Sequence, residues 1–267
     1  MAKKTAKILD LEGKSTGKIE LPSVFETPLR PDVIKRAVLA IQSNSFQPQG
    51  RDPMAGKRTS AESRGTGSGT ARIPRRKGAS GRGAFAPGTV GGRQGHPPLS
   101  EKIIVKRISK KEKKLALFSA IAATGSKKAV AARGHNVEDV VELPLVVSDD
   151  LEAMSKTKEV EEFLIRLGIL SDIFRVRESR KVRAGRGKSR GRKMKHAVGP
   201  LIVVAENRGI AEAAQNIPGV EVATVSTLNP EMLAPGTHPG RLTVWTSSAI
   251  AKLGKLYGKG EQTDGPL

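Results

Sequence analysis

Cysteine is missing from the 267 residues of this chain, and aromatic residues make up only 3% of it. Without cysteine, the chain has no disulfide framework, no thiolate metal site and no cysteine nucleophile. Because rings are so few, the core must be aliphatic, and recognition cannot depend on many stacked aromatic side chains. The lack of cysteine fits a reducing compartment.

Long apolar runs are missing too. No stretch approaches the roughly 18 consecutive apolar residues that indicate a transmembrane helix. The opening, MAKKTAKILDLEG, has no long apolar stretch of the kind found in signal peptides. Neither of the two most basic segments contains an amphipathic helix suited to a membrane surface. We therefore expect a cytoplasmic protein with no membrane partner.

Patterns that would indicate catalysis or a cofactor are weak. The segment Gly185–Ser189 looks superficially like a phosphate-binding loop, but Val182 stands where that motif needs glycine. Asp149 and Asp150 follow an expected strand, where α/β enzymes often place acids, yet helix capping is the simpler interpretation. The four histidines are isolated from one another: His96, His135, His196 and His238. The sequence predicts no catalytic residue, no metal site and no cofactor.

Positive charge is what the chain has in excess, with a net +21. Residues 47–98 contain ten Lys and Arg against two acids, with twelve Gly and six Pro. Residues 175–196 contain eleven Lys and Arg against one acid. These segments carry +8 and +10, which leaves only +3 for the other 193 residues. Two segments of this kind cannot build a core, and their charge favours nucleic acid as the partner.

The remainder of the chain reads as one α/β domain formed by residues 1–46 and 99–267. Strands are expected at 7–11, 18–21, 143–147, 201–205, 220–225 and 242–245. Helices are expected at 31–41, 115–123, 160–167, 209–216 and 249–257. Ser109 and Glu112 form a capping box before the second of these helices. Continuous apolar strands that alternate with amphipathic helices predict a mostly parallel sheet covered on both faces.

Residues 47–98 are expected to be an extended loop inserted in this domain. Arginine outnumbers lysine there, and a guanidinium can fork onto phosphate and stack on bases. The many glycines would let the backbone approach phosphate closely. We expect the loop to be disordered until it binds RNA. A plain flexible linker is the alternative, but it would need neither so much arginine nor the scattered Ile73, Phe85 and Val90.

Residues 175–196 form a second, denser basic segment within the domain. If half of the 21 cations in the two segments contact phosphate, log affinity should fall against log salt with a slope of about −7 to −9. A nuclear-localisation run is the alternative interpretation. The length and the glycine spacing of the segment exceed what such a run needs.

Several strings together resemble the family of the fourth protein of the large ribosomal subunit, in its archaeal and eukaryotic form. They are VFETPLRPDVIKRAV, KRTSAESRGTGSGTARIPR, GGRQGHPP, LPLVVSDD, RKVRAGRGKSRGRK and APGTHPGRLTVWTSSAI. The resemblance covers the chain from Lys7 to Leu256. It implies a Rossmann-like body and a structural rather than catalytic role in the ribosome. It also implies an extended loop that threads through large-subunit ribosomal RNA, helps in early subunit assembly and lines part of the nascent-peptide exit tunnel.

The resemblance also implies partners and RNA-binding residues. The partners are large-subunit ribosomal RNA, neighbouring ribosomal proteins including the other protein of the tunnel constriction, and the nascent peptide at the loop tip near 75–82. In the loop, the matching residues are Arg58, Arg64, Gly65, Gly67, Arg72, Arg75 and Arg76, to which the nearby cations Lys77, Arg82 and Arg93 are added. In the second segment they are Arg180, Lys181, Arg183, Arg186, Lys188, Arg190, Arg192 and Lys193, with Lys195 added. The tip string RKGASGRG is the least family-like part of the loop.

Two other functions stay open on the sequence alone. A general RNA chaperone or nucleic-acid-compacting protein would use the same charge without a defined site. A nucleotide-dependent enzyme would need the phosphate-binding fingerprint that is missing here.

Overall fold

The computed structural model describes residues 4–78 and 81–257. Their Cα atoms pack as two compact units, one of residues 4–41 and 107–257 and the other of residues 42–78 and 81–106. The first unit is called the body here, and the second the loop unit. The helices and strands described below belong to the body, except that helix α1 (Pro31–Asn44) continues past residue 41 into the loop unit.

The body contains a six-stranded sheet in the order β2-β1-β3-β8-β6-β7. Its strands are β1 (Thr5–Leu9), β2 (Ser15–Glu20), β3 (Leu145–Val147), β6 (Leu201–Val204), β7 (Glu221–Thr224) and β8 (Thr243–Thr246). Only the β1–β2 pair is antiparallel, with Lys7 opposite Lys18. The other pairs are parallel, with Val244 of β8 opposite both Leu145 and Ile202. The predicted mostly parallel α/β sheet is confirmed.

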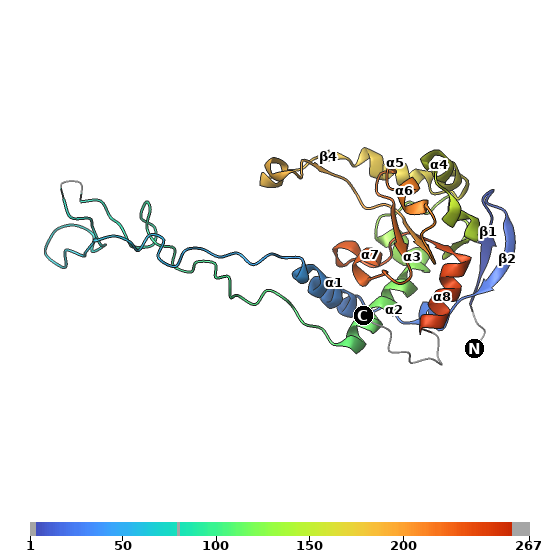
Figure 1. Cartoon of the computed structure of the whole chain (residues 1–267), viewed down its shortest axis with the longest axis horizontal. Coiled ribbons are helices and arrows are strands. Elements are labelled where there is room, and N and C mark those ends of the chain that lie inside the picture. The colour runs from blue at the N-terminus through green and yellow to red at the C-terminus, as the bar shows by residue number, and fades with distance from the viewer. Residues whose placement is uncertain (1–3, 79–80, 258–267) are drawn as a thin grey trace. The chain divides into compact units, whose positions relative to one another are not determined.

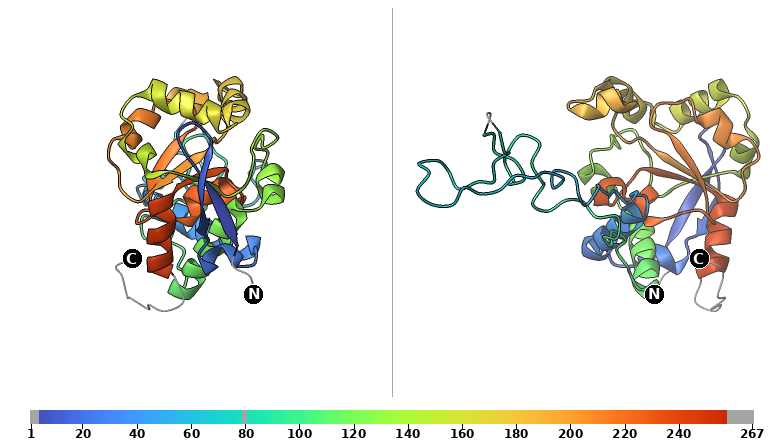
Figure 2. Two further views of the ribbon diagram at one scale, coloured as in Figure 1. Left: turned by 90° about the vertical axis from the view of Figure 1, so that its right-hand side faces the viewer. Right: turned by 60° about the vertical axis from the view of Figure 1, so that its left-hand side comes forward.

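Helices cover both faces of this sheet (Figures 1 and 2). They are α1 (Pro31–Asn44), α2 (Lys110–Thr124), α3 (Lys127–Ala132), α4 (Thr157–Arg166), α5 (Leu170–Glu178), α6 (Ile210–Ala214), α7 (Pro230–Leu233) and α8 (Ser247–Tyr257). Short 3-10 turns are η1 (Ser23–Glu26), η2 (Asp149–Ala153), η3 (Arg186–Arg190) and η4 (Pro235–Thr237). The helices α1, α2, α7 and α8 pack on one face, and α3 to α6 on the other.

Successive side chains of a strand point to opposite faces of the sheet, so the strands of the body contribute to two separate cores. Val203 of β6 joins the core beneath α1, α2 and α8, whereas Ile202 and Val204 join the core beneath α4, α5 and α6. Because both faces are covered, every residue of β6 is buried. This explains why the strand reads as a continuous apolar run.

The capping box of α2 forms only in part. The Ser109 hydroxyl accepts a hydrogen bond from the Glu112 backbone N–H at 3.2 Å. The Glu112 carboxylate, however, binds Arg36 of α1 at 2.9 Å. The predicted start of α2 is therefore confirmed, while the Glu112 side chain connects α2 to α1 instead of closing the capping box.

The structure differs from the expected elements in three places. The strand expected at 18–21 begins earlier, so Gly17 lies inside β2. The helices α3 and α5 were not predicted. Since α5 includes residues 175–178 and Val176 is fully buried, the start of the second basic segment does contribute to packing.

Candidate nucleic-acid interface

Residues 180–196 of the body form a short antiparallel hairpin, here called the arm. Strand β4 (Lys181–Val182) pairs with β5 (Met194–Lys195), and η3 lies between them. The Arg183 N–H extends the pairing through a 2.8 Å hydrogen bond to the Lys193 carbonyl. Lys181 and Lys195 stand opposite each other, as do Val182 and Met194. The hairpin therefore has one cationic and one apolar side.

The arm carries nine of the predicted RNA-binding residues, from Arg180 to Lys195. Eight of them are exposed, and Arg183 is half-buried with its Nε donating to the Arg192 carbonyl at 3.1 Å. Among the described residues, none of the nine forms an ion pair. Like charges directly opposite each other, as in Lys181 and Lys195, destabilise a strand pair. A bound polyanion would relieve this repulsion.

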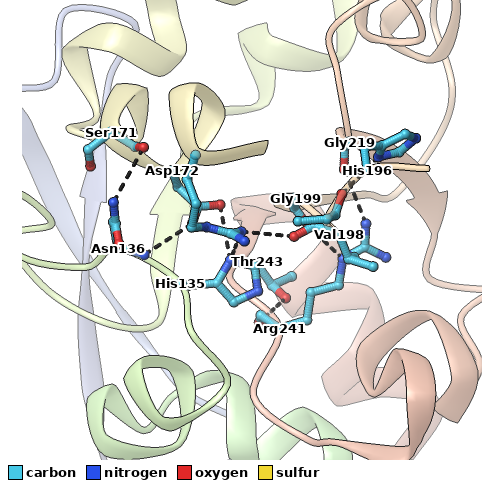
Figure 3. A network of polar contacts seen from close by, with 12 residues as sticks. His135, Asn136, Ser171, Asp172, His196, Val198, Gly199, Gly219, Arg241 and Thr243 are labelled. Atoms are coloured by element: carbon cyan, nitrogen blue, oxygen red, sulfur yellow. Dashed lines mark hydrogen bonds and ion pairs between the residues drawn. The ribbon is translucent and has the colours of Figure 1, made fainter. Parts of the chain in front are cut away.

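A buried polar network holds both ends of the arm (Figure 3). Asp172 of α5 binds His135 Nδ1 at 3.0 Å and Arg175 Nε at 2.9 Å through its two carboxylate oxygens. Arg175 in turn donates to the Val198 carbonyl at 2.9 Å, beyond the far end of the arm. Arg175 is thus part of the fold rather than a free cation. Sequence reasoning missed this role, although the spacing of Asp172 and Arg175 by three residues on a helix is a typical ion-pair signal.

The environment of this network shifts two pKa values. Burial would raise the pKa of Asp172, but hydrogen bonds from His135 and Arg175 outweigh it and hold that pKa below its ordinary value. Burial lowers the pKa of His135, against the opposing hydrogen bond to Asp172. The network at neutral pH therefore contains an ionised carboxylate and a neutral imidazole.

Arg241 makes a second buried anchor beside the first (Figure 3). Its side chain is nearly inaccessible, and its Nε donates to the Gly199 carbonyl at 2.9 Å. It also binds the Glu221 carboxylate at 2.6 Å. Because Gly199 lies two residues before β6, Arg241 fixes the chain where it returns from the arm to the sheet.

The loop unit has contacts of its own but, in residues 47–78 and 81–98, no regular helix or strand. Isolated bridges join Glu62 to Arg75 and Arg75 to Gly83. Gly56 lies so close to the Gly92 carbonyl that a Cβ would stand 2.5 Å from it. Close packing of backbone within the loop unit is therefore a second use of glycine, besides the expected approach to phosphate.

The predicted cations of the loop fall into two groups. Four are engaged: Arg58 pairs with Asp52, Lys77 pairs with Glu62, Arg93 lies over the Phe85 ring, and Arg75 donates to the Gly81 carbonyl. Four are exposed and form no ion pair with another described residue: Arg64, Arg72, Arg76 and Arg82.

The two predicted glycines of the loop motif lie in open positions. Gly65 and Gly67 have positive φ, and a Cβ added at either of them would meet no other described atom within 4 Å. Their backbone is accessible to a ligand. Ala79 and Ser80, in the middle of the predicted tip at 75–82, lie outside the described residues.

The carboxyl edge of the sheet, where open α/β folds bind ligands, is occupied by the chain itself. One oxygen of the buried Glu152 accepts hydrogen bonds from the Ala205 N–H, the Thr246 hydroxyl and the Ser248 hydroxyl at 2.8–3.1 Å. Asp149 accepts from the Ser248 N–H at 2.8 Å and so caps α8, which confirms the capping interpretation for Asp149, whereas Asp150 accepts from the Ser148 hydroxyl at 3.1 Å. The hydrogen bonds of Glu152 and Asp149 therefore connect the carboxyl ends of β3, β6 and β8.

Residues 4–78 and 81–257 contain no cluster of three His, Asp or Glu arranged to hold a metal ion. In that part of the chain, no helix has the length and apolarity to cross a membrane.

Comparison with known proteins gives full-length matches. The chain is 51% identical over 252 residues to the large ribosomal subunit protein uL4 of Methanosphaera stadtmanae, which covers 94% of this chain and 97% of that protein. It is 48% identical over 260 residues to the protein of the same name from Saccharolobus islandicus, with 97% of both chains covered. The family described as Ribosomal protein L4/L1 matches residues 19–256. The chain therefore belongs to the Ribosomal protein L4/L1 family.

Proposed function

We propose that this chain is a structural component of the large ribosomal subunit that binds large-subunit ribosomal RNA. The observation that carries the proposal is the arm, whose nine cations are free of ion pairs with described residues. A surface so charged gains most from a partner with closely spaced negative charges. The names of the relatives, large ribosomal subunit protein uL4, support the same assignment.

The arm is the main RNA contact in this proposal. Its base is held by Asp172, Arg175 and Arg241, so part of the ordering cost of binding is already met by folding. If all nine cations contact phosphate, the log–log salt slope is about −6 to −8.

Residues 47–98 are proposed to act as an RNA-binding loop inserted in a globular α/β domain of residues 1–46 and 99–267. The free guanidiniums of Arg64, Arg72, Arg76 and Arg82 would bind phosphate, and Gly65 and Gly67 would allow close backbone approach. Roles in early assembly and in lining the exit tunnel near 75–82 are part of the proposal, on the family resemblance. In the cell the chain would be cytoplasmic and ribosome-bound.

A structural role is preferred to catalysis because the chain's own hydrogen bonds occupy the carboxyl ends of β3, β6 and β8. Glu152 there already accepts three hydrogen bonds from its own chain. A nucleotide would have to displace these contacts at a cost for each buried polar group left unpaired.

Sedimentation tests the proposal. A tagged copy expressed in an archaeal host should co-migrate with large subunits through a high-salt gradient, because a defined RNA site resists salt better than diffuse charge. A variant with the nine arm cations replaced by Gln serves as the control and should stay near the top. Release of the wild-type chain at high salt, with equal binding to duplex DNA and ribosomal RNA, would instead identify a compacting protein.

A further inference from the structure

A groove lies between α5 and the arm. It has a volume of about 620 Å³, which falls within the range of small-molecule sites. Ile173, Phe174 and Arg177 of α5 line it, together with Arg180, Met194 and His196 of the arm. The groove thus opens on the apolar side of the hairpin, which Met194 provides.

Phe174 is the unusual member of this lining, since 48% of its surface is exposed. The other rings of the body are packed: Phe25 contacts Trp245 edge-on at 5.6 Å, Phe118 contacts Tyr257 at 5.2 Å, and Phe163 is buried. Phe174 makes no ring contact with another described residue. Met194 beside it is 38% exposed. Together they offer a flat ring and a polarisable thioether to a ligand.

The polar lining of the groove suits a nucleotide. Arg177 and Arg180 are exposed, and their guanidiniums have no hydrogen-bond partner among the described residues. Guanidinium groups bind phosphate through paired N–H donors. Glu161 and Asn216 also line the groove, and a carboxylate or an amide can pair with the amino groups of a base edge.

We propose that this groove binds one unstacked nucleotide of the RNA that the arm holds. The base lies against Phe174 and Met194, and its phosphate binds Arg177 and Arg180. The inference rests on the proposed function and specifies how part of that RNA is recognised. Single-stranded and bulged nucleotides are the usual targets of aromatic side chains in RNA recognition.

An apolar side chain of a neighbouring protein would also fit against Phe174. Charge favours the nucleotide, because two unpaired guanidiniums face one carboxylate in the lining. The groove is also continuous with the arm, whose remaining charged residues are all cations. An uncharged apolar partner would partly desolvate the guanidiniums of Arg177 and Arg180 without supplying a counter-charge.

Filter binding to transcribed large-subunit ribosomal RNA tests the inference. Phe174→Ala should weaken binding about 5- to 150-fold, as expected for the loss of one stacked base, and should leave the salt slope unchanged. Arg177→Gln with Arg180→Gln should weaken binding and reduce the salt slope by about 0.7 to 0.9, because the two side chains bind one phosphate. Ile165→Ala is the matched control, since Ile165 is 44% exposed on α4 and does not line the groove. The thermal transition of each variant checks that it is folded.

Ultraviolet cross-linking to the same unmodified RNA supplies a direct readout. The tryptic peptide 167–175 should carry a nucleotide adduct on Phe174 in the wild-type chain. If the wild type does not bind this RNA at all, the proposed function fails. If the wild type binds but Phe174→Ala matches Ile165→Ala, or if peptide 167–175 carries no adduct, only the nucleotide groove is overturned. Normal RNA binding by Phe174→Ala with loss of retention in salt-washed subunits would assign the groove to a protein partner and would likewise overturn it.

Discussion

At the scale of single residues, Asp172 connects three separate parts of the body. It lies on α5, and its carboxylate binds His135 after α3 and Arg175 on the same helix, which in turn donates to the Val198 carbonyl beyond the arm. It also accepts the Asn136 N–H at 3.1 Å. A fully buried carboxylate is costly to desolvate, so its stability depends on these donors. Against the effect of burial, the hydrogen bonds from His135 and Arg175 hold the pKa of Asp172 below its ordinary value.

Replacing Asp172 should therefore destabilise the body. Asp172→Ala leaves the partly buried guanidinium of Arg175 without its counter-charge, and we expect a loss of about 3 kcal/mol in the free energy of unfolding. Urea denaturation at neutral pH measures this loss. Glu178→Ala removes an exposed acid from the same helix and should change stability by less than about 0.5 kcal/mol. Equal effects of the two substitutions would show that the Asp172 network does not stabilise the fold.

His135 should make stability depend on pH below about 6.5. Its pKa is lowered in the folded chain by burial, with Arg175 and Arg133 acting in the same direction against Asp172. The unfolded chain, with an ordinary His pKa of about 6.5, therefore binds a proton first as the pH falls. Stability is fully present above that pH and decreases with acidification.

The variant His135→Gln isolates this effect. It should be less stable than the wild type at pH 7, and its stability should fall less steeply between about pH 6.5 and 5. Urea denaturation across this range gives both slopes. Parallel curves for the two proteins would mean that His135 titrates alike in the folded and unfolded chains.

At the scale of elements, the arm shows where sequence patterns stop being informative. The strands β6 and β8 could be predicted because burial on both faces makes them apolar runs. The strands β4 and β5 have only two residues each, Lys-Val and Met-Lys, which no periodicity can reveal. The contacts that hold the two ends of the arm, His135 with Asp172 and Arg175 with Val198, join residues far apart in the sequence. The cations of the arm could be predicted from the sequence, but the buried hydrogen bonds that hold the ends of the arm could not.

Helix α5 was not predicted because its end has the composition of a basic segment. Leu170, Ile173 and Val176 follow helical spacing, yet Arg175 and Arg177 have the composition of the basic segment that follows. Phe174 and Met194 were consequently not recognised as candidate site residues. Net charge alone could not separate the structural Arg175 from the exposed Arg177.

The arm and the loop tip should differ in their contributions to RNA affinity. Replacing Arg75, Arg76 and Arg82 by Ala should weaken binding less than neutralising the cations of 180–195, because Arg75 is already bonded to Gly81 within the loop unit. The tip would also meet RNA only late in assembly. A matched triple, Arg186, Arg190 and Arg192→Ala, removes the same number of charges from the arm. Filter binding to large-subunit ribosomal RNA compares the two triples, and equal losses would contradict this order.

At the scale of the whole molecule, the segments that carry the excess positive charge are largely separate from those that form the apolar core. The three apolar core clusters are built from residues of the body. In the loop unit, Ala84 is the buried apolar residue among those described. The near-neutral part of the sequence thus supplies most of the packing, while residues 47–98 and the arm supply mainly surface.

Limited proteolysis of the free protein should reveal this division. We expect the first cuts within 47–98 or 175–196, where few apolar side chains hold the backbone, and not within 201–225. A protease without preference for Lys or Arg, such as subtilisin, avoids a bias toward the basic segments. Mass spectrometry of the early fragments locates the cuts. Early cleavage within β6 or β7 would refute the assignment of that region to the core.

Removing most of the loop should leave a folded body. Gly56 and Gly92 are in close backbone contact, so Gly56 can be joined to Gln94 after deletion of Lys57–Arg93 without stretching the chain. The deletion removes no residue of the three core clusters. Closing the shorter loop also costs less conformational entropy. We expect a soluble protein with a cooperative thermal transition close to that of the full chain, measured by calorimetry. As the control, the same number of Gly and Ser residues in place of Lys57–Arg93 separates the loss of loop contacts from the change in chain length. If both proteins lost the cooperative transition, residues 57–93 would have to be counted as part of the folding core.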